Sequence, residues 1–212
     1  MTDIHKTVSP YVDKEIPFEG YLRANQLDNN NYLNLKKNLI KEHQGKCFQN
    51  HGYIVKIGNI PDSTSTDLSM PIAKENLEPV IKVQINANCK LCLPLIGSYI
   101  IGRVASINKM MLMFINGPIN GIISLEREKI NNKNFKNTND TIRYIKNDED
   151  GNLKLKAIKN GDYIKVNIDQ IKMTEGKINI LTLGTLDSMA TQDDIELFER
   201  DELFLPEKLK NA

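Results

Sequence analysis

The second half of the chain carries a series of short strand signals separated by Gly and Asn turns, and this pattern constrains the fold more than any other feature. Each signal is a run of mainly β-branched and apolar residues. Runs of this kind at short spacing predict a small antiparallel barrel rather than strands that alternate with helices. The candidate strands are Tyr99–Ile107, Met110–Ile115, Gly121–Ser124, Asp162–Ile171 and Lys177–Leu183.

An Asn- and Lys-rich insertion, residues 126–159, separates the third candidate strand from the fourth. It is the main irregularity in a barrel of this size, and it contains a turn signal at Asp148–Gly151. Five strands are the number found in an OB-fold, a barrel that commonly carries single-stranded nucleic acid. We therefore expect an OB-fold domain over residues 95–186 that encloses this insertion.

The first half predicts a helix packed on an antiparallel sheet. A short strand is expected at Ile16–Leu22, and apolar residues at spacings of three and four predict a helix over Asp28–Glu42. Gly52–Ile57 and Val80–Ala87 alternate in the manner of half-buried strands. Residues 16–94 are therefore expected to form an α+β domain of their own.

The two ends of the chain differ from its body. Residues 1–15 predict a flexible arm. From Asp187 onward acids outnumber bases eight to three, which leaves a net charge of −5 on residues 187–212 and +6 on the rest. Thr191 and Asp194 have the spacing of a capping box, so a short helix is expected in this acidic C-terminal extension. The expected fold class is α+β, mostly β.

Composition excludes several classes of protein. With 40% hydrophobic and 26% charged residues, the 212-residue chain has the values of a folded globular protein rather than a disordered one. No apolar run is long enough for a membrane helix, and the N-terminus lacks the apolar core of a secretory signal. Three cysteines without such a signal indicate a reducing, intracellular compartment.

Two stretches of the sequence are similar to a known protein family. Leu39–Ile57, with its Gly-x-Cys followed by Gly-Tyr-Ile, resembles the tip domain of the stalk subunit of DNA-directed RNA polymerase, which is the seventh subunit of eukaryotic RNA polymerase II and has an archaeal counterpart. Pro94, Gly97 and Gly102 resemble the family's junction between tip and barrel. The order of elements matches over residues 16–186, and the barrel resembles an OB-fold of the ribosomal S-one variety.

This resemblance implies a non-catalytic subunit that acts in initiation and guides the transcript. Its implied partners are the large core subunits of the polymerase, contacted by the tip domain, and single-stranded RNA, bound weakly and without sequence preference by the OB-fold. In cellular stalks a small companion subunit binds beside this subunit, and whether one does so here stays open. Docking on the core is expected at Gly52, Tyr53 and Val55.

The sequence also departs from the family. Ser98 stands where the family has an acid, and the insertion and the acidic tail have no counterpart in its short cellular members. Enrichment in Asn, Lys and Ile is typical of an AT-rich genome, which leads to the hypothesis of a large DNA virus that encodes its own polymerase. The expected location is then the virion and host cytoplasm, or the nucleus for a cellular eukaryotic protein.

The expected RNA-binding face combines basic and aromatic side chains, because phosphates attract cations and bases stack on aromatic rings. For Phe114, strand alternation leaves a core position and a stacking platform equally open. Since only 6% of the residues are aromatic and none is Trp, binding is expected to be modest and salt-dependent. The face is expected to include Lys109, Phe114, Arg143, Tyr144, Lys146 and Lys165.

Two alternatives stay open beside the stalk subunit. One is a free-standing OB-fold RNA-binding or translation-factor-like protein, which would bind RNA tightly without a polymerase. The other is a metal-dependent enzyme, with zinc held by Cys47, Cys89 and Cys92 near His43 and His51, and with the acidic cluster of the insertion. The chain has no phosphate loop, dinucleotide fingerprint or H-E-x-x-H motif, so no catalytic residue and no cofactor are expected.

Overall fold

The computed structural model divides the chain into two compact units. The barrel unit comprises Met1–Pro10, Pro94–Met173 and Asn179–Ala212, and the sheet unit comprises Tyr11–Leu93 and Thr174–Ile178. The structure describes residues 6–27, 31–48, 51–60, 68–69, 80–125, 134–138, 141–147 and 153–210.

The sheet unit is built on two long antiparallel strands. β1 and β5 pair in register along their whole length, and the other strands extend the sheet in the order β1-β5-β3-β2, with β4 also paired to β5. Every second residue of β5 from Ile81 to Leu91 is buried, as expected for a strand with one face in a core. The strands are β1 (Tyr11–Arg23), β2 (Cys47–Phe48), β3 (Gly52–Ile57), β4 (Leu68–Ser69) and β5 (Val80–Cys92).

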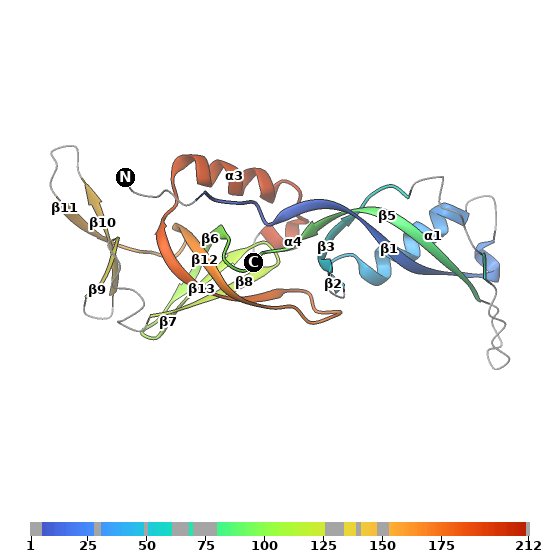
Figure 1. Cartoon of the computed structure of the whole chain (residues 1–212), viewed down its shortest axis with the longest axis horizontal. Coiled ribbons are helices and arrows are strands. Elements are labelled where there is room, and N and C mark those ends of the chain that lie inside the picture. Colours follow the sequence, from blue (N-terminus) through green and yellow to red (C-terminus); the bar gives the residue numbers. More distant parts are fainter. Residues whose placement is uncertain are drawn as a thin grey trace. The chain divides into compact units, whose positions relative to one another are not determined.

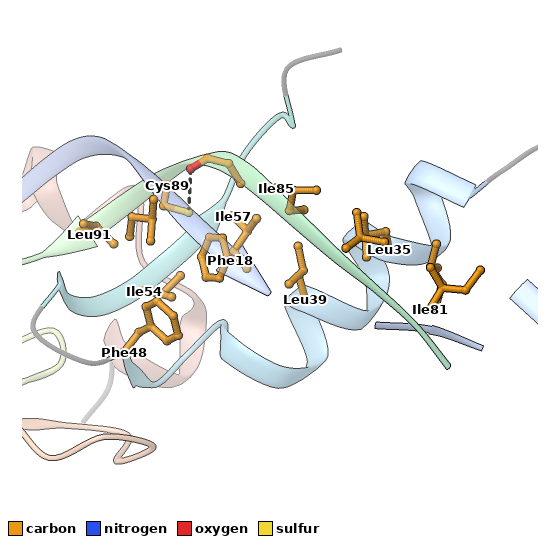
Figure 2. Packing of buried hydrophobic residues seen from close by; sticks show 14 residues of the cluster. Phe18, Leu35, Leu39, Phe48, Ile54, Ile57, Ile81, Ile85, Cys89 and Leu91 are labelled. Carbon is orange, nitrogen blue, oxygen red and sulfur yellow. Dashed lines mark hydrogen bonds between the residues drawn. The ribbon is translucent and has the colours of Figure 1, made fainter. Parts of the chain in front are cut away.

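One helix covers the apolar face of this sheet (Figure 1). α1 (Asn31–His43) buries Leu35 and Leu39 among side chains of the strands, as Figure 2 shows. Gly20 of β1 allows the helix to approach closely, because a Cβ atom there would lie 2.5 Å from Leu35 Cδ1. The core comprises Ile16, Phe18, Leu22, Leu35, Leu39, Phe48, Ile54, Ile57, Ile81, Val83, Ile85, Ala87, Cys89 and Leu91.

Both long strands extend beyond the segments expected from the sequence. β1 starts at Tyr11, within the segment expected to be a flexible arm, and continues into a short 3-10 helix, η1 (Ala24–Gln26). Upstream of β1, the Val8 N–H donates to the Tyr99 carbonyl at 2.9 Å within the barrel unit. β5 continues to Cys92 rather than ending at Ala87. Val8 and residues 11–15 are therefore held by backbone hydrogen bonds that side-chain patterns do not reveal.

The barrel unit contains a closed five-stranded barrel. Hydrogen bonding follows the order β12-β13-β8-β7-β6 and returns from β6 to β12, and β13 runs parallel to β8 while the other neighbours are antiparallel. The predicted mostly β architecture with a five-stranded barrel is confirmed, and the barrel is consistent with an OB-like fold. Its strands are β6 (Tyr99–Ile107), β7 (Met111–Asn116), β8 (Ile119–Ser124), β12 (Tyr163–Lys172) and β13 (Ile180–Met189).

Two of the three junction residues have clear structural reasons. Gly102 lies against the ring of Phe114, which is fully buried, and a Cβ atom on Gly102 would overlap that ring. Gly97 has a φ of 79°, a conformation that favours glycine, and its N–H donates to the Ile168 carbonyl at 2.7 Å. Pro94 is buried at the start of this turn.

The insertion between β8 and β12 contains a small sheet. Its strands pair in the order β11-β10-β9 and pair with no strand of the barrel in the described part of the chain. Phe135 of β9 and Ile142 of β10 are buried, as is Ile158, which directly follows β11. The acidic cluster at Asp148–Gly151 lies outside the described residues. The strands are β9 (Phe135–Thr138), β10 (Thr141–Asn147) and β11 (Leu153–Ala157).

The acidic tail is helical, as expected. α3 (Gln192–Glu202) begins at the predicted capping box, in which the Asp194 N–H donates to Thr191 Oγ1 at 3.3 Å and the Thr191 N–H donates to Asp194 Oδ2 at 3.0 Å. Phe198 packs edge-on against Tyr163 with ring centroids 5.2 Å apart. A short helix, α4 (Glu207–Lys210), follows. No helix among the described residues has the length and apolar character needed to cross a membrane.

Candidate nucleic-acid interface

The outer face of β7, β8 and β13 is apolar. Met113 of β7 lies opposite Ile122 of β8, which lies opposite Leu183 of β13. In the next row Ile115, Asn120 and Leu181 are neighbours in the same way. Met113, Leu181 and Leu183 are 39%, 46% and 47% exposed. We call the five apolar side chains of these two rows the apolar stripe: Met113, Ile115, Ile122, Leu181 and Leu183.

The apolar stripe occupies the face with which OB-folds often bind nucleic acid, namely their second and third strands. Strong single-strand binders place basic groups and aromatic rings there. Lys109 lies beside this face, in the turn between β6 and β7, and is exposed together with Met110. The Asn108 side chain orders that turn, because its Oδ1 accepts hydrogen bonds from the backbone N–H groups of Met110 at 3.0 Å and Met111 at 2.8 Å.

Phe114, one of the two aromatic residues expected to stack on bases, is fully buried in the barrel. Gly121 of β8 and Gly102 of β6 leave the space that its ring fills. Of the two positions that the sequence left open, the structure shows the core position. No face of this ring is available to a base.

Lys165, expected to contact phosphates, is also buried. Its Nζ lies 3.4 Å from Asp194 Oδ2, and the two side chains are only 6% and 10% exposed. Asp194 also accepts hydrogen bonds from Thr7 Oγ1 at 2.5 Å and Thr191 Oγ1 at 2.9 Å. The lysine charge is thus compensated within the barrel unit, so Lys165 is not placed to bind a phosphate.

These contacts determine the protonation of Asp194. Burial alone would raise its pKa, but hydrogen bonds from Thr7 and Thr191 and the charge of Lys165 outweigh burial, and the pKa lies below its usual value. The group lines an open groove of about 700 Å³ together with Lys6 and other residues near the start of α3. Asp194 is therefore charged, and its contacts connect the N-terminal segment, β12 and α3.

Arg143, Tyr144 and Lys146 all lie on β10 of the inserted sheet rather than on the barrel. Arg143 lies opposite Lys136 of β9, and Tyr144 lies opposite Lys156 of β11. Arg143 and Tyr144 are partly exposed, whereas the side chain of Lys146 lies outside the described part of the structure. The structure thus groups three of the six expected residues on one sheet and separates them from Lys109, Phe114 and Lys165.

The expected docking residues of the sheet unit lie in its interior. Tyr53 and Val55 are each 3% exposed, and a Cβ atom on Gly52 would lie 2.7 Å from the Cys92 carbonyl oxygen. Gly52 also has a φ of 104°, so its identity is explained by backbone conformation. Burial raises the pKa of Tyr53 to about 12, with smaller contributions from Cys47 and Cys92. These residues support the fold and present little surface to a partner.

The three cysteines do not converge on a metal site. Cys47 and Cys92 each lie opposite Tyr53 and therefore share one face of the sheet, whereas Cys89 belongs to the core under α1. All three thiols are buried and none forms a disulfide, and burial raises the pKa of Cys89 to about 11. Among the residues that the structure describes, no group of three or more His, Cys, Asp or Glu side chains could hold a metal ion.

The two histidines of the zinc hypothesis pack on aromatic rings. His43 lies 4.9 Å from Phe48 and 5.4 Å from Phe18, measured between ring centroids, and His51 stacks on Phe48 at 5.8 Å. Burial lowers the pKa of His43, and the charges of Glu42, Lys46 and Glu175 modify the effect. Both imidazoles thus have a packing role in the sheet unit.

The feature that sequence reasoning missed is the strand structure of the insertion. β11 reads Leu-Lys-Leu-Lys-Ala, an alternation of period two that would have identified a strand. The Asn-rich composition around it suggested only an irregular segment. Recognising this alternation would have placed the basic residues of the insertion on a sheet.

Comparison with known proteins relates the chain to RNA polymerases. No protein-family model matches it. A protein of Acanthamoeba polyphaga mimivirus named as a DNA-directed RNA polymerase subunit is 30% identical over 155 residues, which cover 73% of this chain and 71% of the mimivirus protein. Because the match extends over most of both chains, it includes far more than one shared motif. The chain belongs to the family of DNA-directed RNA polymerase subunits that this mimivirus protein represents.

Proposed function

We propose that the chain is the stalk subunit of a multi-subunit DNA-directed RNA polymerase. The observation that carries the proposal is a helix-covered sheet followed by an OB-like barrel in a member of a polymerase-subunit family. This is the order of elements that the resemblance to the stalk family implies. In this role the chain performs no chemistry itself, since catalysis belongs to the large subunits, and it acts in initiation and in guiding the transcript.

Docking on the large subunits is assigned to the sheet unit, as in the stalk family. Since Tyr53 and Val55 are buried, other residues must make the contact. Leu27, Tyr32 and Leu33 lie near the start of α1 and are 45%, 47% and 57% exposed. Exposed apolar groups that gather in this way mark contacts with other proteins. We assign them to the contact with the large subunits.

The barrel unit contacts emerging RNA in this proposal. Lys109, Arg143 and Tyr144 are the expected RNA residues whose described side chains are at least partly exposed. Contacts of this kind supply weak, sequence-independent affinity, which suffices for an RNA that is delivered by the polymerase itself. A viral polymerase, with the chain in the virion and host cytoplasm, is the setting that the mimivirus relative favours.

Affinity purification of the tagged full chain from infected or native cells, followed by mass spectrometry, tests this function. The expected result is recovery of the large polymerase subunits at near-equal ratio, with a small companion subunit as a further outcome to be scored. Recovery of RNA without polymerase would instead favour a free-standing RNA-binding protein, and the stalk proposal would be withdrawn.

A variant pair tests the docking surface. Leu33→Glu places a charge among the exposed apolar residues of α1 and is expected to reduce recovery of the large subunits at least about tenfold, because a buried unpaired charge is costly at an interface. Gln84→Glu adds the same charge at an exposed position of β5 and should leave recovery unchanged. Equal recovery with both variants would remove this surface from the proposal.

A further inference from the structure

The inserted sheet has an unusual distribution of charge. Its three strands contain no Asp or Glu, and all acids of the insertion lie outside them. The basic residues of the strands come from each of the three and are spread along the whole sheet. They are Lys136, Arg143, Lys146, Lys154 and Lys156.

Register places like charges directly opposite one another. Arg143 lies opposite Lys136. Like charges in such cross-strand positions destabilise a sheet. A three-stranded sheet with few buried side chains has little stability to spare, so such a pair is a cost that folding alone does not explain. A bound polyanion would turn the same pair into favourable contacts.

The described basic side chains are also open to a ligand. Lys136 and Lys156 are exposed and Arg143 is partly exposed. In the described part of the chain none of these three makes an ion pair. Successive residues of a strand point to opposite faces, so Tyr144 and Lys156 lie on the other face of the sheet from Arg143 and Lys136. The two cations that one RNA strand can meet together on one face are therefore Lys136 and Arg143.

The outer face of the barrel offers few such groups. Along the apolar stripe, a phosphate would meet mainly Met, Ile and Leu side chains, and Lys165 is paired with Asp194. The polar neighbours of the stripe are Asn120 within it and Lys109 in the adjoining turn. The two surfaces therefore differ in the chemistry that they can bind, and the inserted sheet matches an RNA backbone better than the stripe does.

We propose that the inserted sheet β9–β11, rather than the outer face of the barrel, is the RNA-binding surface of this protein. It binds the phosphates of single-stranded RNA through Lys136 and Arg143, which share one face of the sheet, and accepts any base sequence. The proposal specifies the RNA contact of the proposed stalk function and rests on it for the choice of RNA as the polyanion.

Fluorescence anisotropy with the full chain and a labelled 20-nucleotide RNA of mixed sequence tests this surface. The Lys136→Glu/Arg143→Glu variant is expected to weaken binding at least about tenfold at 50 mM salt, because two phosphate contacts become repulsive. The control, Lys56→Glu/Lys172→Glu, changes the net charge equally at exposed positions of β3 and β12 and should weaken binding less than about threefold. Circular dichroism verifies that both variants are folded.

Salt dependence gives a second measure. For the unmodified chain, log affinity should fall with log salt at a slope of about −1.4, as expected for two phosphate contacts on a single strand. The sheet variant should have a slope close to zero, and the control should keep the slope of the unmodified chain. Equal losses in both variants, or a sheet variant that binds like the unmodified chain, would overturn the proposal.

Failure of this inference is distinguishable from failure of the stalk function. If the sheet variant loses RNA binding and the tagged chain recovers polymerase subunits, both the stalk function and the RNA-binding role of the sheet are supported. If polymerase is absent from the purification but the variants behave as expected, the inference on the sheet stands and the stalk function falls. If polymerase is recovered and the sheet variant still binds RNA normally, the stalk function stands and this surface is wrong.

Discussion

The apolar stripe of the barrel and the inserted sheet β9–β11 belong to the same unit but carry opposite surface chemistry. The stripe presents Met113, Leu181 and Leu183 across neighbouring strands, whereas the inserted sheet presents lysines and an arginine with no acid among them. The barrel thus has the fold of a nucleic-acid carrier without the side chains for that purpose on its usual face. Fold and binding surface have to be judged separately, since function depends on the site and not on the fold.

The largest expected effect concerns the barrel core. Phe114→Ala removes a fully buried ring that lies between Gly102 and Gly121, and it should lower the free energy of unfolding by about 3–5 kcal/mol. Urea denaturation followed by circular dichroism measures the loss. Met113→Ala, at the exposed neighbouring position, should change stability by no more than about 0.5 kcal/mol. If Phe114→Ala keeps full stability but loses RNA binding, the ring stacks on bases, and the contrast drawn between the barrel and the inserted sheet is wrong.

A smaller effect is expected at the buried ion pair. Lys165→Met keeps most of the side-chain volume but leaves Asp194 with its hydrogen bonds from Thr7 and Thr191 and without its cation. The expected cost is about 1–3 kcal/mol in the free energy of unfolding, with RNA affinity within about twofold of the unmodified chain. The exposed Lys172→Met serves as the control. Weaker RNA binding at unchanged stability would assign Lys165 to the RNA surface.

The stripe can be converted into a basic surface to sharpen the comparison. Met113→Lys with Leu183→Lys adds two cations at exposed positions, so stability should change by less than about 1 kcal/mol in total. RNA affinity at 50 mM salt is expected to rise about threefold, because the added charges provide new phosphate contacts. Met113→Gln with Leu183→Gln is the uncharged control and should leave affinity unchanged. No gain from the lysines would indicate that RNA already covers this face or cannot reach it.

The smallest expected effect is a difference in pH response between the two units. The pKa of His43 in the sheet unit is lowered by burial from 6.5, so the unfolded state binds more protons and stability falls as the pH drops below 6.5. The pKa of Asp194 in the barrel unit is also lowered, and its contribution is complete above the usual aspartate value of about 3.9 and is lost as the pH falls through the folded pKa.

Of these two groups, only His43 should change the stability of its unit between pH 6.5 and 5. The sheet unit should therefore lose stability over this range, and Asp194 should cause no loss in the barrel unit. Hydrogen exchange of the β3 and β12 backbone amides over this range measures both units in one sample. The His43→Phe variant should abolish the loss in β3. Faster exchange in β12 with unchanged exchange in β3 would contradict the assignment.

Much of the barrel could be predicted from the sequence, because Gly and Asn turns separate its strands. The orientation of β7 could not be predicted. It reads Met-Leu-Met-Phe-Ile-Asn, so both faces are apolar and alternation does not show that Phe114 points inward. The burial of Lys165 was also beyond prediction, since it depends on Asp194 of α3, which is remote in the sequence.

The start of β1 and the inserted sheet show a second reason why the observed strands differ from the predicted ones. Val12–Glu15 are exposed and mostly polar, and they are held in β1 by backbone pairing with β5, which leaves no side-chain signal. β9–β11 have a small core and many lysines, so their pattern resembles that of a loop except in the Leu-Lys alternation of β11. Strands that pair without burying a full apolar face are the ones that sequence patterns fail to reveal.

Photocrosslinking of the full chain to RNA containing 4-thiouridine, followed by mass spectrometry of the crosslinked peptides, tests the central claim most directly. We expect crosslinks on β9 and β10, at or next to Lys136 and Arg143, and few on β7, β8 or β13. Crosslinks concentrated on Met111–Ser124 and on Leu181 and Leu183 would show that RNA binds the barrel face, and would contradict the account.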